Sequence, residues 1–439
     1  MRNERAARAA SRSTTAAIRR AWLPLLGAAL LLVAGAYFLV TWLGVGADPS
    51  STPPLTYAEL TGSIFLPAPG KPTGAPRVRE LSLPAMPDAS SVWGATGRDA
   101  SGRVWVGVST SSSRTSARLL EYDPPAGAWH ERGAVVERLK AAGVYREGES
   151  QIKIHSKIVP AGDGWLYFAS TDEGGEVPGT VHPRWGGHLW RIHPETYGWE
   201  HLLAVPEGLV AVNGVGRYVF ALGYWGHVLY RYDTLTAQTR RTVVGSVGGH
   251  VSRNFLADIR GHAYVPRVRA EAGGGLSAAL VEYDSDLREL AATPLEFYLR
   301  GGSADSNHGI VGLAFLPDGR LLFTTHRGHL YAIDPRGSGA AVVTPLGWFH
   351  PNGEAYAPSL FFLGGSFVAG VTQRAGRYDW VVFELKTGTS LAAPLDTKGL
   401  QSVLLYGSIS RDNAGRVYVV GWAANPTGGY RPLVLQIEP

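Results

Sequence analysis

The stretch Asp99-Ala100-Ser101-Gly102-Arg103-Val104-Trp105-Val106 reads as a tight turn that leads into a short apolar strand. A turn of this kind, in which Asp or Gly is followed by Gly and then by apolar residues, occurs six more times. The later copies begin at Gly162, Gly216, Asp258, Asp318, Gly364 and Asp412. Seven copies of one turn-and-strand unit indicate a protein built from repeated, similar sheets.

A second pattern follows the first in several units, as a strand that ends in Asp. Examples are Leu229-Tyr230-Arg231-Tyr232-Asp233 and Leu330-Tyr331-Ala332-Ile333-Asp334. Each unit therefore reads as four strands joined by tight turns. Residues 77–439 divided among seven units give about 52 residues each, which is typical of propeller blades. We predict an all-β fold here: a seven-bladed β-propeller of four-stranded blades.

The two ends of the predicted propeller complement one another. The last unit supplies strands at Leu405–Ile409, Val417–Val420 and Leu433–Ile437 and then stops, so that it lacks a fourth strand. The segment Arg77–Leu83 alternates polar and apolar residues like a half-exposed strand. We expect this segment to become the outer strand of the seventh blade, because ring closure leaves only short sheet edges.

The N-terminal region predicts a membrane anchor. Residues 21–44 form an apolar, uncharged run with Trp22 and Trp42 near its ends, long enough for a transmembrane helix. Residues 1–20 carry six Arg and one Glu and predict a cytoplasmic tail. Residues 45–76 are rich in proline and predict a linker. The propeller is then extracytoplasmic (periplasmic), on a single-pass anchor in the inner, or cytoplasmic, membrane.

A cleaved secretory signal is the alternative interpretation of this region. Val45-Gly46-Ala47 is acceptable as a cleavage site, and Arg19-Arg20 faintly resembles a twin-arginine signal. The apolar run is longer than the roughly 7 to 15 residues of an ordinary signal core, which favours a retained anchor.

Net charge and cysteine content narrow the function classes. The chain has 41 basic and 36 acidic residues, and the whole excess of +5 lies in the first 20 residues. The predicted propeller is therefore electrically balanced, which argues against nucleic acid as a partner. The chain contains no cysteine, so neither disulfides nor thiolate sites contribute.

Several histidines are expected near one opening of the central channel. His155, His250 and His308 lie at or just before predicted innermost strands, and His326 ends a second strand. Propeller topology places these positions on one face, where neutral imidazoles could bind one divalent metal ion. Individually hydrogen-bonded histidines in a water-filled mouth are the alternative interpretation.

Arginine, glutamine and aromatic residues are candidates for ligand binding on the same face. Arg253 is also the candidate catalytic residue, as a base or as a group that polarises a carboxylate. The other candidates are Trp185, Tyr224, Trp225, Arg267, Arg327, Gln373, Arg374 and Trp422. Guanidinium groups beside aromatic rings suit carboxylates and sugars, and they equally suit a protein partner.

The Asp-x-x-Gly-Arg-Val-Trp/Tyr-Val phrase and the Tyr-Asp-Pro turn resemble the broad streptogramin-lyase and quinoprotein-like class of seven-bladed propellers. The resemblance covers residues 77–439 and concerns the motifs that build blades. It implies the propeller fold. Lyases of this general kind, including oligogalacturonate lyases, hold a metal with histidines at the channel mouth.

Two functions of different classes follow from these patterns. The first is a membrane-anchored binding or scaffold module, as a subunit of a membrane complex or a receptor for an envelope ligand. The second is a metal-dependent lyase or hydrolase acting on a glycan or lactone-like small molecule, with His155, His250, His308 and His326 on the ion. A quinone-cofactor oxidoreductase is a third, minor alternative.

Overall fold

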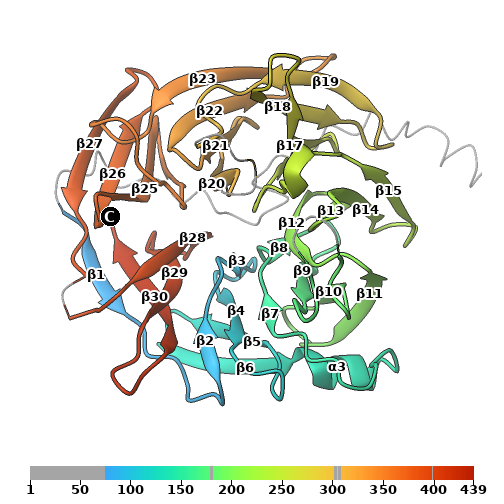
Figure 1. Cartoon of the computed structure of the whole chain (residues 1–439). Helices are drawn as coiled ribbons and strands as arrows, with labels where there is room; N and C mark the ends of the chain where they lie inside the picture. The colour runs from blue at the N-terminus through green and yellow to red at the C-terminus, as the bar shows by residue number, and fades with distance from the viewer. Residues whose placement is uncertain (1–74, 178–180, 301–303, 305–307, 398) are drawn as a thin grey trace, which may run out of the picture. The chain divides into compact units, whose positions relative to one another are not determined.

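A computed structural model describes residues 75–177, 181–300, 304, 308–397 and 399–439. In this part of the chain the strands form seven antiparallel sheets arranged around a central axis, so the structure is a seven-bladed β-propeller (Figure 1). The expected anchor at residues 21–44 and most of the expected linker lie outside the described residues. Among the residues that are described, no helix has the length and apolar character needed to cross a bilayer.

The first three blades come from the N-terminal half of the propeller. Blade 1 consists of β2 (Ala89–Ser91), β3 (Thr96–Arg98), β4 (Val104–Thr110), β5 (Arg118–Asp123) and β6 (Ala128–Ala134). Blade 2 consists of β7 (Lys153–Ile154), β8 (Val159–Pro160), β9 (Leu166–Thr171), β10 (Gly187–Ile192) and β11 (Trp199–Val205). Blade 3 consists of β12 (Leu209–Val215), β13 (Tyr218–Gly223), β14 (Val228–Asp233) and β15 (Thr239–Val243). Helix α3 (Val135–Ala141) joins the first two blades and was not predicted.

Blades 4 to 6 each contain four strands in sequence order. Blade 4 consists of β16 (Leu256–Ala257), β17 (Ala263–Ala270), β18 (Leu276–Tyr283) and β19 (Glu289–Pro294), and it is preceded by the short helix η1 (Val247–Gly249). Blade 5 consists of β20 (Ile310–Phe315), β21 (Leu321–Thr325), β22 (His329–Asp334) and β23 (Val342–Trp348). Blade 6 consists of β24 (Phe361–Gly364), β25 (Phe367–Arg374), β26 (Arg377–Glu384) and β27 (Thr389–Pro394).

Blade 7 closes the ring with strands from both ends of the propeller, as the sequence predicted. It consists of β28 (Leu404–Arg411), β29 (Val417–Ala424), β30 (Tyr430–Glu438) and β1 (Arg77–Glu80). Strand β1 pairs antiparallel with β30, with Arg77 opposite Glu438 and Glu80 opposite Leu435. Leu81 extends the pairing by donating its backbone N–H to Val434 O at 2.9 Å.

The repeated aspartate turns are held by the same set of bonds in several blades. Asp412 Oδ1 accepts the backbone N–H groups of Ala414 and Arg416 at 2.9 and 3.0 Å. Its Oδ2 accepts Arg416 Nε and the hydroxyl of Tyr418, both at 2.7 Å. Asp258 and Asp99 bind their own turns in the same way. The phrase that marks the repeat is therefore a buried carboxylate that joins a turn to the second strand.

The innermost strand is interrupted in blade 1 and again in blade 2, whereas the sequence predicted four uninterrupted strands in each blade. Strands β2 and β3 both pair with β4, and β7 and β8 both pair with β9. Gly94 lies in the first interruption with φ of 87°, a left-handed conformation that favours glycine. The second interruption contains His155 and Lys157, whose side chains lie at the central channel.

Candidate functional site

The opening of the central channel at the start of the innermost strands contains a polar cavity, which we call the mouth pocket. Its volume is about 70 Å³, which suits a few water molecules or one small polar group. The pocket is lined by Trp93, His155, Lys157, Arg253, Asn254, His308, Val311, Tyr356 and Tyr406. These residues come from six blades, since each innermost strand begins at this opening.

His155 and Arg253 are hydrogen-bonded to one another across the mouth pocket. His155 Nδ1 donates to the carbonyl of Val210 at 2.9 Å, and Arg253 Nη1 donates to His155 Nε2 at 3.1 Å. Burial, together with the nearby charge of Arg253, lowers the pKa of His155 well below its ordinary value. The imidazole is therefore neutral near pH 7, and its one lone pair is used to hold the guanidinium.

His308 and His326 lie face to face beside Tyr356. Their ring centroids are 4.7 Å apart with an interplanar angle of 13°, and Tyr356 packs edge-on against both. Burial is the main cause that lowers the pKa of His308 to about 3 and that of His326 to about 4. Because imidazole lone pairs lie in the ring plane, stacked parallel rings do not direct two nitrogens at one ion.

His250 lies apart from the other three expected metal ligands. Its Nδ1 donates to the carbonyl of Ala304 at 2.8 Å, and its Nε2 accepts the hydroxyl of Tyr298 at 2.7 Å. Both ring nitrogens are thus engaged inside the protein. The described residues contain no group of three or more His, Asp or Glu side chains arranged to hold a metal ion. The four expected ligands therefore do not converge on one point, and they do not fit a metal centre as they are placed.

Four of the predicted ligand-binding residues border the mouth pocket. The Arg253 guanidinium lies 5.7 Å from the ring of Tyr224, which packs tilted against Trp225 with ring centroids 3.8 Å apart. Gln373 pairs through its backbone with Tyr356, and Trp422 Nε1 donates to the Tyr406 hydroxyl at 3.5 Å. Tyr224, Gln373 and Trp422 thus contact residues of the pocket lining, whereas Trp225 contacts Tyr224.

The other predicted ligand-binding residues have partners elsewhere or are exposed. Arg267 forms a two-point ion pair with Glu289 at 2.7 and 2.8 Å. Arg327 pairs with Glu354 and lies over the rings of Phe297 and Trp348. Trp185 packs with Arg146 and Arg184, and Arg374 is exposed at the end of β25. None of these four side chains lines the mouth pocket.

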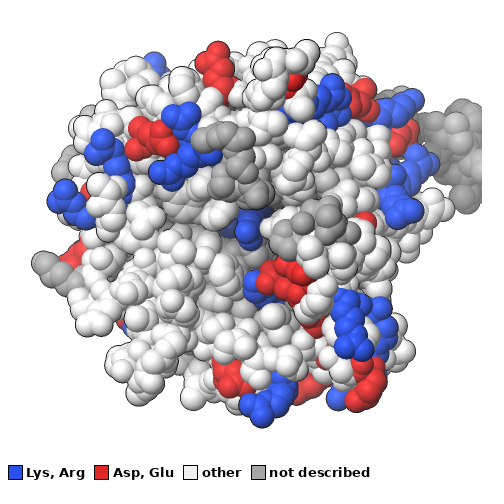
Figure 2. All heavy atoms as spheres, in the orientation of Figure 1, with Lys and Arg blue, Asp and Glu red and all other residues white. Residues whose placement is uncertain are grey.

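Charged groups gather at the centre of the mouth face. Figure 2 shows basic atoms near the axis of the propeller, with an acidic group close to them. Lys153 forms an ion pair with Glu173 on the β9–β10 loop. Glu176 of the same loop accepts Trp225 Nε1 at 2.9 Å, and its pKa is raised mainly by burial. The acids of this loop thus have partners of their own near the mouth.

Lys157 is the most unusual member of the pocket and was not predicted. Its side chain is 5% exposed, and Nζ donates to the carbonyl of Gly94 at 2.8 Å. Burial alone lowers the pKa of this amine to about 7. A buried lysine without a carboxylate partner is destabilising, and such groups are concentrated at functional sites.

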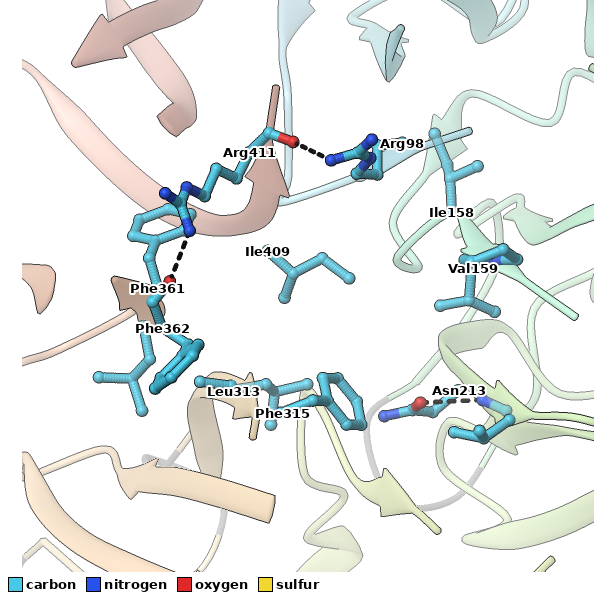
Figure 3. Close-up of a pocket in the computed structure, with 15 residues that line it drawn as sticks. Arg98, Ile158, Val159, Asn213, Leu313, Phe315, Phe361, Phe362, Ile409 and Arg411 are labelled. Carbon is cyan, nitrogen blue, oxygen red and sulfur yellow. Dashed lines mark hydrogen bonds between the residues drawn. The ribbon is translucent and has the colours of Figure 1, made fainter. Parts of the chain in front are cut away.

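A second cavity of about 60 Å³ lies further along the channel and is mainly apolar (Figure 3). Val159, Leu313, Phe315 and Ile409 are among its walls. Arg98 also lies at this cavity, but its guanidinium donates to Asp99 O, Arg411 O and Asn413 Oδ1. Burial lowers the pKa of this arginine. The arginine joins blades 1 and 7 and offers little to a ligand.

Comparisons with known proteins assign no family to this chain. No protein-family model matches the chain, and no curated protein matches it. Among solved structures, the chain is similar to the extracellular domain of the hybrid two component system BT4673 from B. thetaiotaomicron. The two share 14% identity over 82% of this chain and 39% of that one, with a TM-score of 0.49.

Two further likenesses have the same character. YCF48 from Cyanidioschyzon merolae shares 13% identity over 82% of this chain and 99% of its own length, with a TM-score of 0.48. The Dos1 propeller shares 10% identity over 65% of this chain and 67% of that one, with a TM-score of 0.43. At these identities the likeness concerns the fold alone.

Proposed function

We propose that this propeller is a binding module whose ligand enters the mouth pocket. The main support for the proposal is that residues far apart in the sequence line one cavity once the ring is closed. These residues include Trp93, Lys157, Arg253, Tyr356 and Tyr406. Polar and aromatic groups that converge on a concave site are typical of ligand binding. The bulky rings are held by their neighbours, since Trp93 packs on Tyr406 with centroids 4.6 Å apart.

No specific contact among the described residues of the mouth favours the alternative function, a metal-dependent lyase or hydrolase. The lone pair of His155 is used to accept the hydrogen bond from Arg253. An arginine guanidinium is also a poor general base, because it stays protonated. Binding without catalysis needs only the donors that the pocket already presents.

We further propose that residues 21–44 hold the propeller on the outer side of the inner membrane, with residues 1–20 in the cytoplasm. The apolar run, its flanking tryptophans and the arginines before it support this topology. A tethered propeller can then act as a subunit of a membrane complex or bind a small envelope ligand near the bilayer.

Ligand capture by the full chain tests the binding function. The detergent-purified protein is dialysed against a mixed library of small acids, phosphates, neutral sugars and amines, and retained compounds are identified by mass spectrometry. We expect at least one compound to be retained by the wild type and lost from Tyr406→Ala, because this phenol forms one wall of the pocket. Retention of the same compounds by both proteins, or of none, would contradict binding at the mouth.

Cysteine labelling tests the membrane topology, because the chain contains no cysteine of its own. We expect Ala272→Cys, in an exposed loop of the propeller, to react with a membrane-impermeant maleimide in intact spheroplasts. The matched variant Ser11→Cys should react only after the membrane is permeabilised. The opposite pattern, or release of the protein from washed membranes, would show that the proposed anchor is incorrect.

A further inference from the structure

We propose that the mouth pocket is an oxyanion site that holds a carboxylate or tetrahedral oxyanion group of the ligand between the Arg253 guanidinium and the Lys157 ammonium. This inference rests on the proposed function, in which the mouth is the ligand site, and it adds the chemical class of the ligand. Both side chains line the same cavity of about 70 Å³.

The charge of the lining supports an anionic ligand. Arg253 and Lys157 are the strongly basic groups of the lining, and none of the described residues that form it is Asp or Glu. The two glutamates of the β9–β10 loop have partners of their own, since Glu173 pairs with Lys153 and Glu176 binds Trp225. An anion bound in this cavity is attracted by both cations.

The hydrogen bonds of the pocket leave donors for such a group. Lys157 Nζ has three N–H groups, of which one donates to Gly94 O. Arg253 is oriented by His155 through Nη1, and its guanidinium has no other side-chain hydrogen bond to the described residues. Trp93 Nε1 is buried without a hydrogen-bond partner in the described part of the chain. A ligand with two or three oxygens would satisfy donors from three blades at once.

The remaining polar groups of the pocket do not add negative charge near pH 7. Burial is the main cause that raises the pKa of Tyr356 and Tyr406, so both phenols stay protonated. His155 and His308 are neutral because burial and the charge of Arg253 lower their pKa values. The ionisable groups that share this lining with Lys157 are therefore one permanent cation, two neutral imidazoles and two neutral phenols.

Lys157 makes anion binding dependent on pH. Its amine, with a pKa of about 7, is protonated below pH 7 and neutral above it. An anion binds the ammonium more tightly than the amine, so affinity is greatest below pH 7 and falls as the pH rises. We expect a decrease of about tenfold between pH 6 and pH 8.5, because this interval removes most of the proton from the amine.

The thermal stability of the detergent-purified full chain, measured at constant ionic strength with chloride as the balancing ion, tests the inference. Acetate represents the carboxylate and sulfate the tetrahedral oxyanion, and neither titrates between pH 6 and 8.5; neutral acetamide is the control. We expect acetate or sulfate to raise Tm at pH 6 and to raise it much less at pH 8.5. Acetamide should leave Tm unchanged at both pH values. The ion that binds more tightly identifies the ligand group.

Variants connect the effect to the pocket. Arg253→Gln and Lys157→Met should each weaken the apparent affinity at pH 6 by about tenfold or more, since each removes a charge-assisted contact. Lys157→Met should also abolish the pH dependence of anion binding. Glu176 is another ionisable group near the mouth with a shifted pKa, so Glu176→Gln is the control and should keep the pH dependence. The exposed Arg374→Gln is the matched control and should behave like the wild type.

The outcomes separate this inference from the proposed function. Equal stabilisation of wild type and Arg253→Gln would show an adventitious ion only and overturn the inference. Retention of neutral sugars by the mouth, without any response to acetate or sulfate, would keep the binding function and overturn the oxyanion site. A complete absence of retained ligands and ion effects would overturn both.

Discussion

Replacing Asp412 by alanine is expected to destabilise the propeller by about 3–5 kcal/mol, as is typical when one partner of a buried, hydrogen-bonded ion pair is removed. The carboxylate is 1% exposed and accepts bonds from Ala414, Arg416 and Tyr418. Its loss leaves buried donors unpaired. The Tyr418 hydroxyl also accepts Gln436 Nε2 at 2.9 Å, so the damage extends from the turn to β30. Urea-induced unfolding followed by tryptophan fluorescence measures the change.

Asp318 provides the matched control for this prediction. It occupies a similar turn in blade 5 and binds Arg320 through N and Nε, yet its side chain is 41% exposed. Exposed ion pairs of this kind contribute roughly 0–1 kcal/mol. Asp318→Ala should therefore destabilise the protein by less than about 1 kcal/mol. If both variants lost a similar free energy of unfolding, burial of the aspartate would not determine how much the turn contributes to stability.

Replacing residues 77–81 by a Gly-Ser run of the same length should destabilise the propeller by about 4–6 kcal/mol. The replacement removes the burial of Leu81, which contributes about 1.5–3 kcal/mol, and it places glycines in β1, each of which costs about 0.5–1 kcal/mol, so that the pairing of β1 with β30 is weakened. Blade 7 would then expose a long strand edge and become prone to association. Unfolding in urea, together with light scattering, measures both effects.

A Gly-Ser replacement of residues 272–275 is the control for ring closure. This exposed loop between β17 and β18 already contains three glycines, so the same change should alter the free energy of unfolding by less than about 0.5 kcal/mol. If the variant at residues 77–81 were as stable as this control, β1 would not be the strand that closes the ring.

The propeller and its closure could be predicted because both depend on repeated, local patterns. Each aspartate turn is built from residues within a few positions of one another. The last unit of the sequence has three strands where four are expected, and residues 77–83 form the one predicted strand that no other blade uses. Strand direction then placed His155, Arg253 and His308 at the same opening, and the structure brings these three together.

The partners of the side chains could not be predicted from the same patterns. His250 precedes an innermost strand, like His155, but its ring is held by Tyr298 and Ala304, which follow it by many residues in sequence. Register shifts in the innermost strands, for example between Ile310 and Leu313, decide which residues face the axis. Such shifts depend on contacts between blades, which a repeat pattern does not encode.

Some residues of the pocket could have been found from a spacing in the sequence. The first residue of the turn is Asp99 in blade 1, Ala161 in blade 2 and Asp412 in blade 7, as its carbonyl accepts the N–H of the turn glycine. Counting back six residues gives Trp93, His155 and Tyr406, all of which line the mouth pocket. Lys157 has no such equivalent, because it lies where the inner strand of blade 2 is interrupted.

The ionisation of Lys157 shows directly whether the mouth is a cationic pocket for an oxyanion. The chain has six lysines, so 13C labelling of lysine Cε gives few signals, and Lys157→Met assigns the one of interest. We expect the Lys157 amine to titrate near pH 7 in the free protein, and at a higher pH when acetate or sulfate is bound. A Lys157 signal that titrates near pH 10 in every case, with no response to either anion, would contradict it.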